Sequence, residues 1–161
     1  MELRIRRAQT HDVKAARALT NRSWLATYSP IIGERETSSI IEKRHSSTLF
    51  EEQAARLQDR FLVAVADETM VAHLYAFHKD GMYVDRLHVD PDRKGAGIGS
   101  RLLEHLEKQL FSETRLWLDV LKGNDAALGF YRRVGYRITG ETDACGGLAG
   151  IPAIILEKMI R

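Results

Sequence analysis

The chain lacks most of the features that mark secreted, membrane-bound or nucleic-acid-binding proteins. Its 161 residues include one cysteine, Cys145, so no disulfide can form within the chain. No apolar run approaches the roughly 18 residues of a membrane-spanning helix, and residues 1–7 lack the apolar core of a signal peptide. The formal net charge of +2 gives no sign of nucleic-acid binding. We therefore expect a soluble, cytoplasmic protein with neither nucleic-acid nor membrane partners.

Histidine shows no metal-binding pattern either. The six histidines are scattered, and His73 and His78 fit strand positions better than ligand positions. We therefore expect no metal site. The length suits one domain, and a hydrophobic fraction of 44% is ordinary for a globular protein. Residues 1–161 are accordingly predicted to form a single domain.

Hydrophobic periodicity predicts elements in the order β-α-α-β-β-β-α-β-α-β-β. The first helix is expected to run from a cap at Thr10 or Asp12 to about Ala26, where the segment with Pro30 and Gly33 interrupts it. The later helices are expected at 38–58, 97–110 and 125–134, and the strands at 3–7, 61–66, 70–78, 82–89, 115–121, 136–141 and 152–159. This order predicts an α/β domain with one mixed sheet flanked by helices.

A glycine-rich loop between a strand and a helix is the most informative segment. The strand ends at Asp90-Pro91, and Gly95, Gly97 and Gly99 precede an amphipathic helix. Glycines let the backbone approach a ligand closely, and a helix N-terminus offers unpaired N–H groups and a positive dipole end. The pattern predicts a pyrophosphate-binding loop. A tight strand-to-helix connection that binds no ligand would share it.

Two other nucleotide-binding motifs do not fit this loop. A P-loop requires Gly-Lys-Ser/Thr after its last glycine, whereas Gly99 is followed by Ser100-Arg101. The dinucleotide fingerprint Gly-x-Gly-x-x-Gly misses its third glycine by one position, and no convincing acidic ribose ligand follows about 20 residues later. An unrelated nucleotide-binding domain is therefore disfavoured.

A second motif further along makes the chain resemble the GNAT superfamily of acetyl-CoA-dependent N-acetyltransferases. The acyl-CoA loop of that family reads Gln/Arg-x-x-Gly-x-Gly/Ala after a strand that ends Val-x-Pro. Here Lys94-Gly95-Ala96-Gly97-Ile98-Gly99 follows Val89-Asp90-Pro91, and Lys94 is the one departure. The later motif of the family is matched at every position, by Val120, Asn124, Ala127, Tyr131, Gly135 and Tyr136. The resemblance is firm over roughly residues 60–140.

The resemblance implies a mostly antiparallel sheet whose central strands splay apart to admit the pantetheine arm. It also implies that acetyl-CoA is the acetyl donor and that a primary amine of a small molecule or peptide attacks it directly in a ternary complex. A longer acyl-CoA donor is one alternative, and a catalytically silent acyl-CoA-binding sensor or regulatory module is another. Dimers are common in the family, so the sequence allows a homodimer without confirming one.

The resemblance assigns several residues to the cofactor. Backbone groups of Leu87, His88 and Val89 would pair with pantetheine amides like an added strand. Asn124 is either a cofactor contact or an ordinary cap of helix 125–134. The pyrophosphate would bind backbone N–H groups of Gly95, Ala96, Gly97, Ile98, Gly99 and Ser100, with the side chains of Arg93 and Lys94 either touching phosphate or remaining solvated.

Acetyl transfer needs a group that takes the amine proton and, for the leaving thiolate, an acid. Tyr131 is the predicted acid, and packing on an amphipathic helix is its alternative role. Asp85 is the predicted base or amine anchor, and strand alternation places it on the same face as Leu87 and Val89; otherwise it pairs with a neighbouring arginine. Asp119 is a weaker candidate base, and water alone would also serve.

His88 could also act as a base because the unperturbed pKa of histidine is near neutral. A plain strand position is the alternative.

The acceptor site is less well defined. Trp24 and Tyr28 lie four residues apart and could line an apolar or cation-binding pocket, or pack in the core. Acidic residues that could attract a cationic amine are Glu34, Glu36, Glu141 and Asp143. These features do not choose among polyamine, peptide, lysine, amino-acid and drug acceptors.

Overall fold

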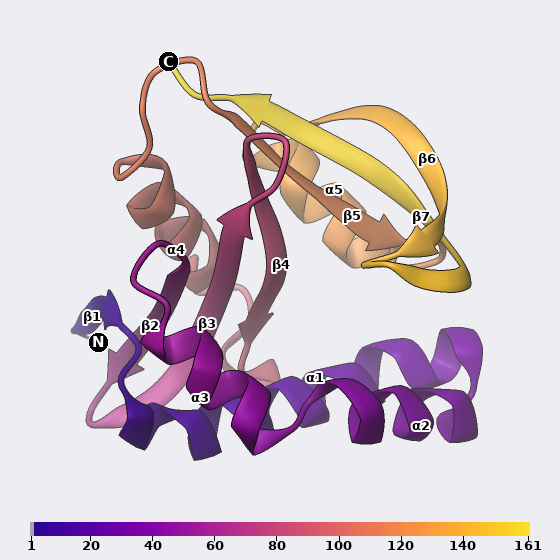
Figure 1. Cartoon of the computed structure of the whole chain (residues 1–161), viewed down its shortest axis with the longest axis horizontal. Helices are drawn as coiled ribbons and strands as arrows, with labels where there is room; N and C mark the ends of the chain where they lie inside the picture. Colours follow the sequence, from indigo (N-terminus) through magenta and orange to yellow (C-terminus); the bar gives the residue numbers. More distant parts are fainter. Residues whose placement is uncertain (1) are drawn as a thin grey trace.

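A computed structural model of the chain describes residues 2–161 (Figure 1). One seven-stranded sheet has the strand order β1-β2-β3-β4-β5-β7-β6, and each neighbouring pair is antiparallel except β4 and β5. The strands are β1 (Leu3–Arg7), β2 (Arg60–Ala66), β3 (Thr69–His78), β4 (Met82–Val89), β5 (Arg115–Leu121), β6 (Arg137–Cys145) and β7 (Leu148–Met159). The helices are α1 (Val13–Ile32), α2 (Glu34–Arg44), α3 (Ser47–Ala55), α4 (Ile98–Glu107) and α5 (Asp125–Arg133), with 3-10 turns at Thr10–Asp12 and Pro91–Arg93. The predicted mixed, mostly antiparallel sheet is confirmed.

Helices cover both faces of the sheet. Side chains alternate along β2, so that Phe61 and Val63 pack with α1 and α3 while Leu62 and Ala64 pack in the core that includes α4 and α5. In Figure 1, α3 lies in front of the sheet and α4 and α5 lie behind it. This two-sided burial explains the nearly continuous apolar sequence of β2.

The strands β4 and β5 pair only at one end. Their register joins Met82 to Leu116 and Tyr83 to Trp117. Beyond these pairs the two strands diverge, as Figure 1 shows. The splayed central strands expected from the sequence are therefore confirmed. The edge of β4 that faces β5 is left without a strand partner from Val84 onward in the described chain.

A β-bulge interrupts β4. Tyr75 of β3 pairs with Arg86 and Ala76 pairs with Val84, so Asp85 is the extra residue of the bulge. A bulge breaks the two-residue alternation of side chains. Asp85 forms an ion pair with Arg86, whose side chain packs on the α3 side of the sheet. The expectation that Asp85 shares a face with Leu87 was therefore wrong.

Helix α1 does not stop before Pro30. It continues through that proline to Ile32, so the predicted interruption was wrong there. Pro30 has no N–H to donate to the carbonyl of Ala26, so α1 continues there with the loss of one helical hydrogen bond. Gly33 ends the helix instead, with φ +94° and its N–H donating to the carbonyl of Ser29 at 3.0 Å.

The predicted helix over 38–58 is two helices. The chain leaves α2 at His45, and α3 begins after Ser46, whose hydroxyl oxygen accepts a hydrogen bond from the N–H of Leu49 at 3.1 Å. Serine is a strong N-cap, and it was overlooked because the apolar periodicity runs across it.

Much of the segment between the predicted strands 136–141 and 152–159 is also strand. β6 continues to Cys145 and β7 begins at Leu148, so the two form a long hairpin. Gly146 and Gly147 make the turn with φ values of +56° and +82°.

Candidate active site

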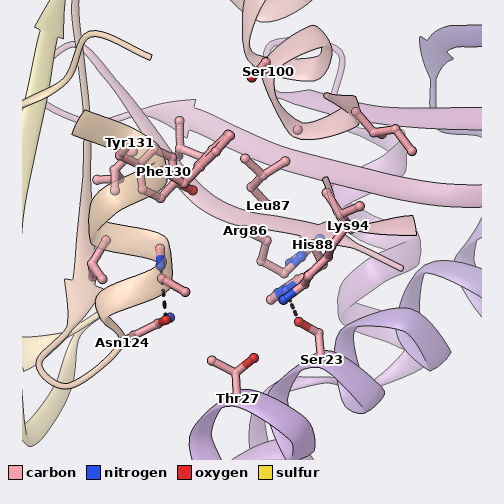
Figure 2. A pocket seen from close by; sticks show the side chains of 18 of the residues that line it. Ser23, Thr27, Arg86, Leu87, His88, Lys94, Ser100, Asn124, Phe130 and Tyr131 are labelled. Carbon is pink, nitrogen blue, oxygen red and sulfur yellow. Dashed lines mark hydrogen bonds between the residues drawn. The ribbon is translucent and has the colours of Figure 1, made fainter. Parts of the chain in front are cut away.

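A cleft of about 610 Å³ lies where β4 and β5 diverge. Side chains of α5 lie on one side of it and those of β4 on the other, as Figure 2 shows for Asn124 and Tyr131 facing Leu87 and His88. The sequence-predicted site residues that line it are Trp24, Tyr28, Asp85, Leu87, His88, Val89, Arg93, Lys94, Gly95, Gly97, Ile98, Gly99, Ser100, Asn124 and Tyr131. Ala96 of the same loop does not line the cleft.

The three loop glycines have different physical roles. Gly95 and Gly97 have φ values of +87° and +77°, and a Cβ atom on either would meet nothing within 4 Å. Glycine is needed there for the left-handed backbone, and the space beside it is open. Gly99 does not have a left-handed φ, but a Cβ atom added to it would lie 3.1 Å from Cζ of Phe130. A glycine at this position lets α4 pack closely against α5.

The N-terminus of α4 points its free amides toward this loop region. Gly97 is the N-cap, and its carbonyl accepts the N–H of Arg101 at 3.1 Å. The N–H groups of Ile98, Gly99 and Ser100 lie in the first turn, so they have no carbonyl partner within the helix. With Lys94 at the rim, this end of the cleft suits an anion.

Asn124 caps α5. Its Oδ1 accepts a hydrogen bond from the N–H of Ala127 at 3.3 Å, so the capping interpretation is confirmed. The residue also lines the cleft. A contact with a cofactor stays a prediction.

Tyr131 is both packed and directed at the cleft. It is 8% exposed, and its ring makes edge-to-face contacts with Phe130 and Tyr136 at centroid distances of 5.1 and 5.6 Å. Burial raises the pKa of its phenol. The phenol therefore stays protonated across the neutral range and is available as a donor.

Asp85 presents its carboxyl to the cleft. Its side chain is 30% exposed and lies 3.7 Å from Nη1 of Arg86, beyond ordinary hydrogen-bond distance. Partial burial raises the pKa of this carboxyl; Arg86 and Arg44 oppose the shift and Asp119 adds to it. A carboxyl with a raised pKa in a cleft is suited to proton transfer.

His88 does not have the properties of a base. Its Nδ1 lies 2.9 Å from the hydroxyl oxygen of Ser23, and the ring is buried (Figure 2). Burial and the nearby charge of Arg86 lower the pKa of His88 to about 3. A histidine with so low a pKa is a weak proton acceptor.

Arg86 is the neighbouring arginine that pairs with Asp85, and the sequence did not predict its burial. Its side chain is 6% exposed, and its guanidinium lies over the rings of Phe50 and Tyr75 at 4.1 and 4.8 Å. Burial lowers the pKa of this guanidinium to about 10. An arginine on a strand usually indicates a solvated position, so no signal in the sequence predicted that this partner of Asp85 is buried.

Trp24 and Tyr28 lie together on α1, with ring centroids 4.3 Å apart and edge-to-face. Both are half-buried and line the cleft. Because α1 continues to Ile32, the two rings share one face of a continuous helix. The two rings therefore pack against each other and also line the cleft.

The described residues 2–161 contain no group of three or more His, Cys, Asp or Glu side chains arranged to hold a metal ion. In the same part of the chain, no helix combines the length and apolar character needed to cross a membrane.

Comparison with known proteins agrees with this geometry. The family model described as "Acetyltransferase (GNAT) family" matches residues 20–136. The chain belongs to this family. A solved structure with a similar fold is the PaiA N-acetyltransferase of Thermoplasma acidophilum in complex with coenzyme A, with a TM-score of 0.84, 26% identity and 99% coverage of both chains. The apo form of YjaB from Escherichia coli gives a TM-score of 0.71 at 25% identity, covering 98% of this chain and 97% of that one.

Curated GNAT relatives match over a shorter segment. The peptidyl-lysine N-acetyltransferase YjaB of Escherichia coli is 38% identical over 63 residues, which is 39% of this chain and 41% of that protein. The uncharacterized N-acetyltransferase YesJ of Bacillus subtilis is 38% identical over 71 residues, which is 43% of this chain and 39% of the length of YesJ. The chain thus spans about two-fifths of the length of these relatives.

Proposed function

We propose that this protein transfers an acetyl group from acetyl-CoA to a primary amine. One observation carries the proposal: a single cleft joins a glycine loop at a helix N-terminus to a neutral phenol and a carboxyl. We name its two parts the cofactor end, lined by Lys94–Ser100, and the acceptor end, lined by Trp24, Tyr28, Asp85 and Asp119. Membership of the GNAT family supports the proposal, as does the coenzyme A complex of PaiA.

The residues at the cofactor end fit coenzyme A. The open space beside Gly95 and Gly97, next to the free amides of α4, would take the pyrophosphate. The β4 edge from Val84 to Val89 lacks a β5 partner, so its N–H and C=O groups would pair with the pantetheine amides. When bound, acetyl-CoA supplies an activated thioester carbonyl and a thiolate leaving group.

Asp85 and Tyr131 each carry out one of the two proton transfers that the reaction needs. The carboxylate of Asp85 accepts the proton that the amine nitrogen loses as it bonds to the carbonyl carbon. The phenol of Tyr131 donates toward the sulfur as the carbon–sulfur bond breaks. In sum, one proton leaves nitrogen and one joins sulfur. The raised pKa of Asp85 supports this division, since its carboxyl is a stronger base than an exposed one, and the phenol of Tyr131 holds a proton at neutral pH.

The acceptor belongs to the small-molecule or peptide amines. A lysine side chain in a peptide is the first to test, because relatives matched over part of the chain are named peptidyl-lysine N-acetyltransferases. A catalytically silent sensor is not favoured, because those relatives are named as transferases and Asp85 and Tyr131 both line the cleft. A cytoplasmic location, a single domain over residues 1–161 and the lack of a nucleic-acid partner stay predictions.

The proposal is tested by thiol release from acetyl-CoA in the presence of lysine peptides, polyamines, amino acids and aminoglycosides. Amine-dependent release supports the transferase and identifies its acceptor class. Calorimetry with acetyl-CoA, ATP and NAD provides a separate test of the cleft. Binding of ATP or NAD but not acetyl-CoA would contradict the assignment of the cofactor end.

A further inference from the structure

The buried guanidinium of Arg86 is held mainly by aromatic rings. Its Cζ lies 4.1, 4.8 and 5.3 Å from the ring centroids of Phe50, Tyr75 and Phe61. In the described chain, its Nε and Nη2 have no hydrogen-bond partner. A planar guanidinium stacks favourably on aromatic faces, so these rings fix its position. We call Phe50, Phe61 and Tyr75 the aromatic cage.

The aromatic cage belongs to the packed core. Phe50 and Phe61 are 0% exposed and Tyr75 is 2% exposed. Phe61 packs edge-to-face on Phe50 and on Tyr75, with centroid distances of 6.2 and 5.6 Å. The hydroxyl of Tyr75 donates a hydrogen bond to the carboxylate of Asp59. The cage is therefore formed by α3, β2 and β3 themselves and needs no ligand.

The third nitrogen of Arg86 faces the proposed base. Its Nη1 lies 3.7 Å from Oδ2 of Asp85. Consecutive side chains of a regular strand point to opposite faces, and the bulge at Asp85 is what brings these two together. At this distance the attraction is that between two opposite charges rather than a hydrogen bond. The aromatic cage thus sets a positive charge beside a carboxyl that lines the cleft.

The charges around Asp85 make Arg86 its main partner. Burial raises the pKa of Asp85, and Arg86 is the positive group that opposes this rise most. The other charged groups that face Asp85 are Arg44 of α2, Asp119 of β5 and Lys79 of β3. Removing the charge of Arg86 would therefore leave burial less opposed, and the carboxyl would hold its proton to a higher pH.

The titratable groups that face Arg86 from neighbouring elements are neutral. They are Tyr75, His45, His73 and His88. Burial is the main cause that lowers the pKa values of the three histidines, and it also raises that of the tyrosine. All four are uncharged at neutral pH, so the carboxylate of Asp85 is the charge that pairs with this buried cation.

We infer that Arg86 is a positioning residue for the proton transfer: fixed by the aromatic cage, it holds the Asp85 carboxylate at the cleft and favours its ionised form. The inference rests on the proposed function, because it assigns Arg86 to the base of that reaction. Asp85 accepts the amine proton, and Arg86 keeps its own protons throughout. Pairing with an arginine and acting as a base were alternative roles for Asp85, and this geometry lets one carboxyl have both.

The test measures the ionisation of Asp85 in Arg86→Met, which fills the aromatic cage with an apolar side chain. Loss of an opposite charge so close is expected to raise the pKa of Asp85 by about one unit or more. Carbon-13 NMR titration of the Asp85 carboxyl measures this directly, and the rise of kcat/KM with pH should move to higher pH by the same amount. Arg86→Lys keeps the charge but loses the planar stacking, so its midpoint should lie between those of Arg86→Met and the wild type. Arg86→Gln, which is also neutral, replaces Arg86→Met if that variant does not fold.

Arg115→Met is the matched control. Arg115 also stacks on an aromatic ring, that of Trp117 at 4.6 Å, and pairs with the carboxylate of Glu157 at 2.6 Å. It lies outside the cleft lining, so its loss should leave both midpoints unchanged. In an Asp85→Asn background, Arg86→Met should not change the pH dependence further, because the carboxyl through which it acts is absent.

An equal loss of kcat/KM at every pH, with the Asp85 midpoint unchanged, would show a merely structural role for Arg86 and overturn the inference. So would a shift of the pH profile that persists in the Asp85→Asn background. A wild type that turns over no amine at all would instead overturn the proposed function, whatever the NMR titration shows.

Discussion

The cofactor end of the cleft is made by consecutive residues, whereas the acceptor end is assembled from distant parts of the chain. Lys94–Ser100 shape the first through backbone conformation and the N-terminus of α4. The second combines rings on α1, a bulge in β4 and Asp119 on β5. One end can therefore be recognised from local sequence, and the other depends on tertiary contacts. Such a division suits an enzyme with one fixed donor and an acceptor that varies between relatives.

Gly97→Glu should have the largest effect and should act on the cofactor end alone. A side chain at φ +77° strains the backbone, and a carboxylate at the helix N-terminus repels phosphate. We expect the acetyl-CoA Kd from calorimetry to rise by about 100-fold or more. Gly150→Glu is the control, since Gly150 has φ +83° and open space but lies on β7 outside the cleft. Retained affinity in Gly97→Glu would remove the pyrophosphate assignment.

Asp85→Asn should come next and should act on chemistry at the acceptor end. Removing a general base typically costs about 100-fold in kcat. The wild-type rate should rise with pH as the Asp85 carboxyl ionises, at a pKa above its ordinary value of 3.8, and the variant should lose this rise. The measurement is the pH dependence of kcat/KM, with Asp67→Asn in the β2–β3 turn as control. An identical profile in Asp85→Asn would exclude the carboxyl as the base.

Tyr131→Phe should have a smaller effect, because it removes one donor and leaves the ring in place. We expect kcat to fall by about tenfold, while the acetyl-CoA Kd stays within about twofold. Tyr136→Phe removes a neighbouring hydroxyl that does not line the cleft and should leave kcat unchanged. If both variants behave like the wild type, the role of Tyr131 is packing.

Cys145→Ala should have the smallest effect. Burial and two neighbouring carboxylates raise the pKa of the thiol to about 12, so little thiolate exists at neutral pH. We expect kcat within about twofold of the wild type and slow labelling by a thiol reagent. A loss of activity together with an acetylated cysteine in the wild type would replace direct transfer with a covalent intermediate.

The difference between the two ends also explains which features the sequence revealed. The strand-loop-helix motif at Lys94–Gly99 and the cap at Asn124 follow from neighbouring residues, so periodicity and glycine spacing sufficed. The bulge at Asp85 depends on the register of β3 against β4, which no local sequence pattern in β4 predicts. The same is true of the hydrogen bond from Arg44 to the carbonyl of Gly146, since these residues lie 102 positions apart in the sequence.

Two other features of the structure differ from what the sequence predicts. Arg86 is charged yet lies in an aromatic environment, because the bulge turns it toward Phe50. Pro30 stays within α1 although its missing N–H removes one hydrogen bond of the helix. For Arg86, tertiary packing outweighed a residue preference that is right on average.

Mass spectrometry of an amine panel, led by a lysine-containing peptide and incubated with acetyl-CoA and the protein, tests the central claim most directly. Acetylation of an amine nitrogen by the wild type, lost in Gly97→Glu and retained in Gly150→Glu, is the result that the cleft predicts. If acetyl-CoA binds but no amine in the panel gains an acetyl group, the claim of N-acetyl transfer is contradicted.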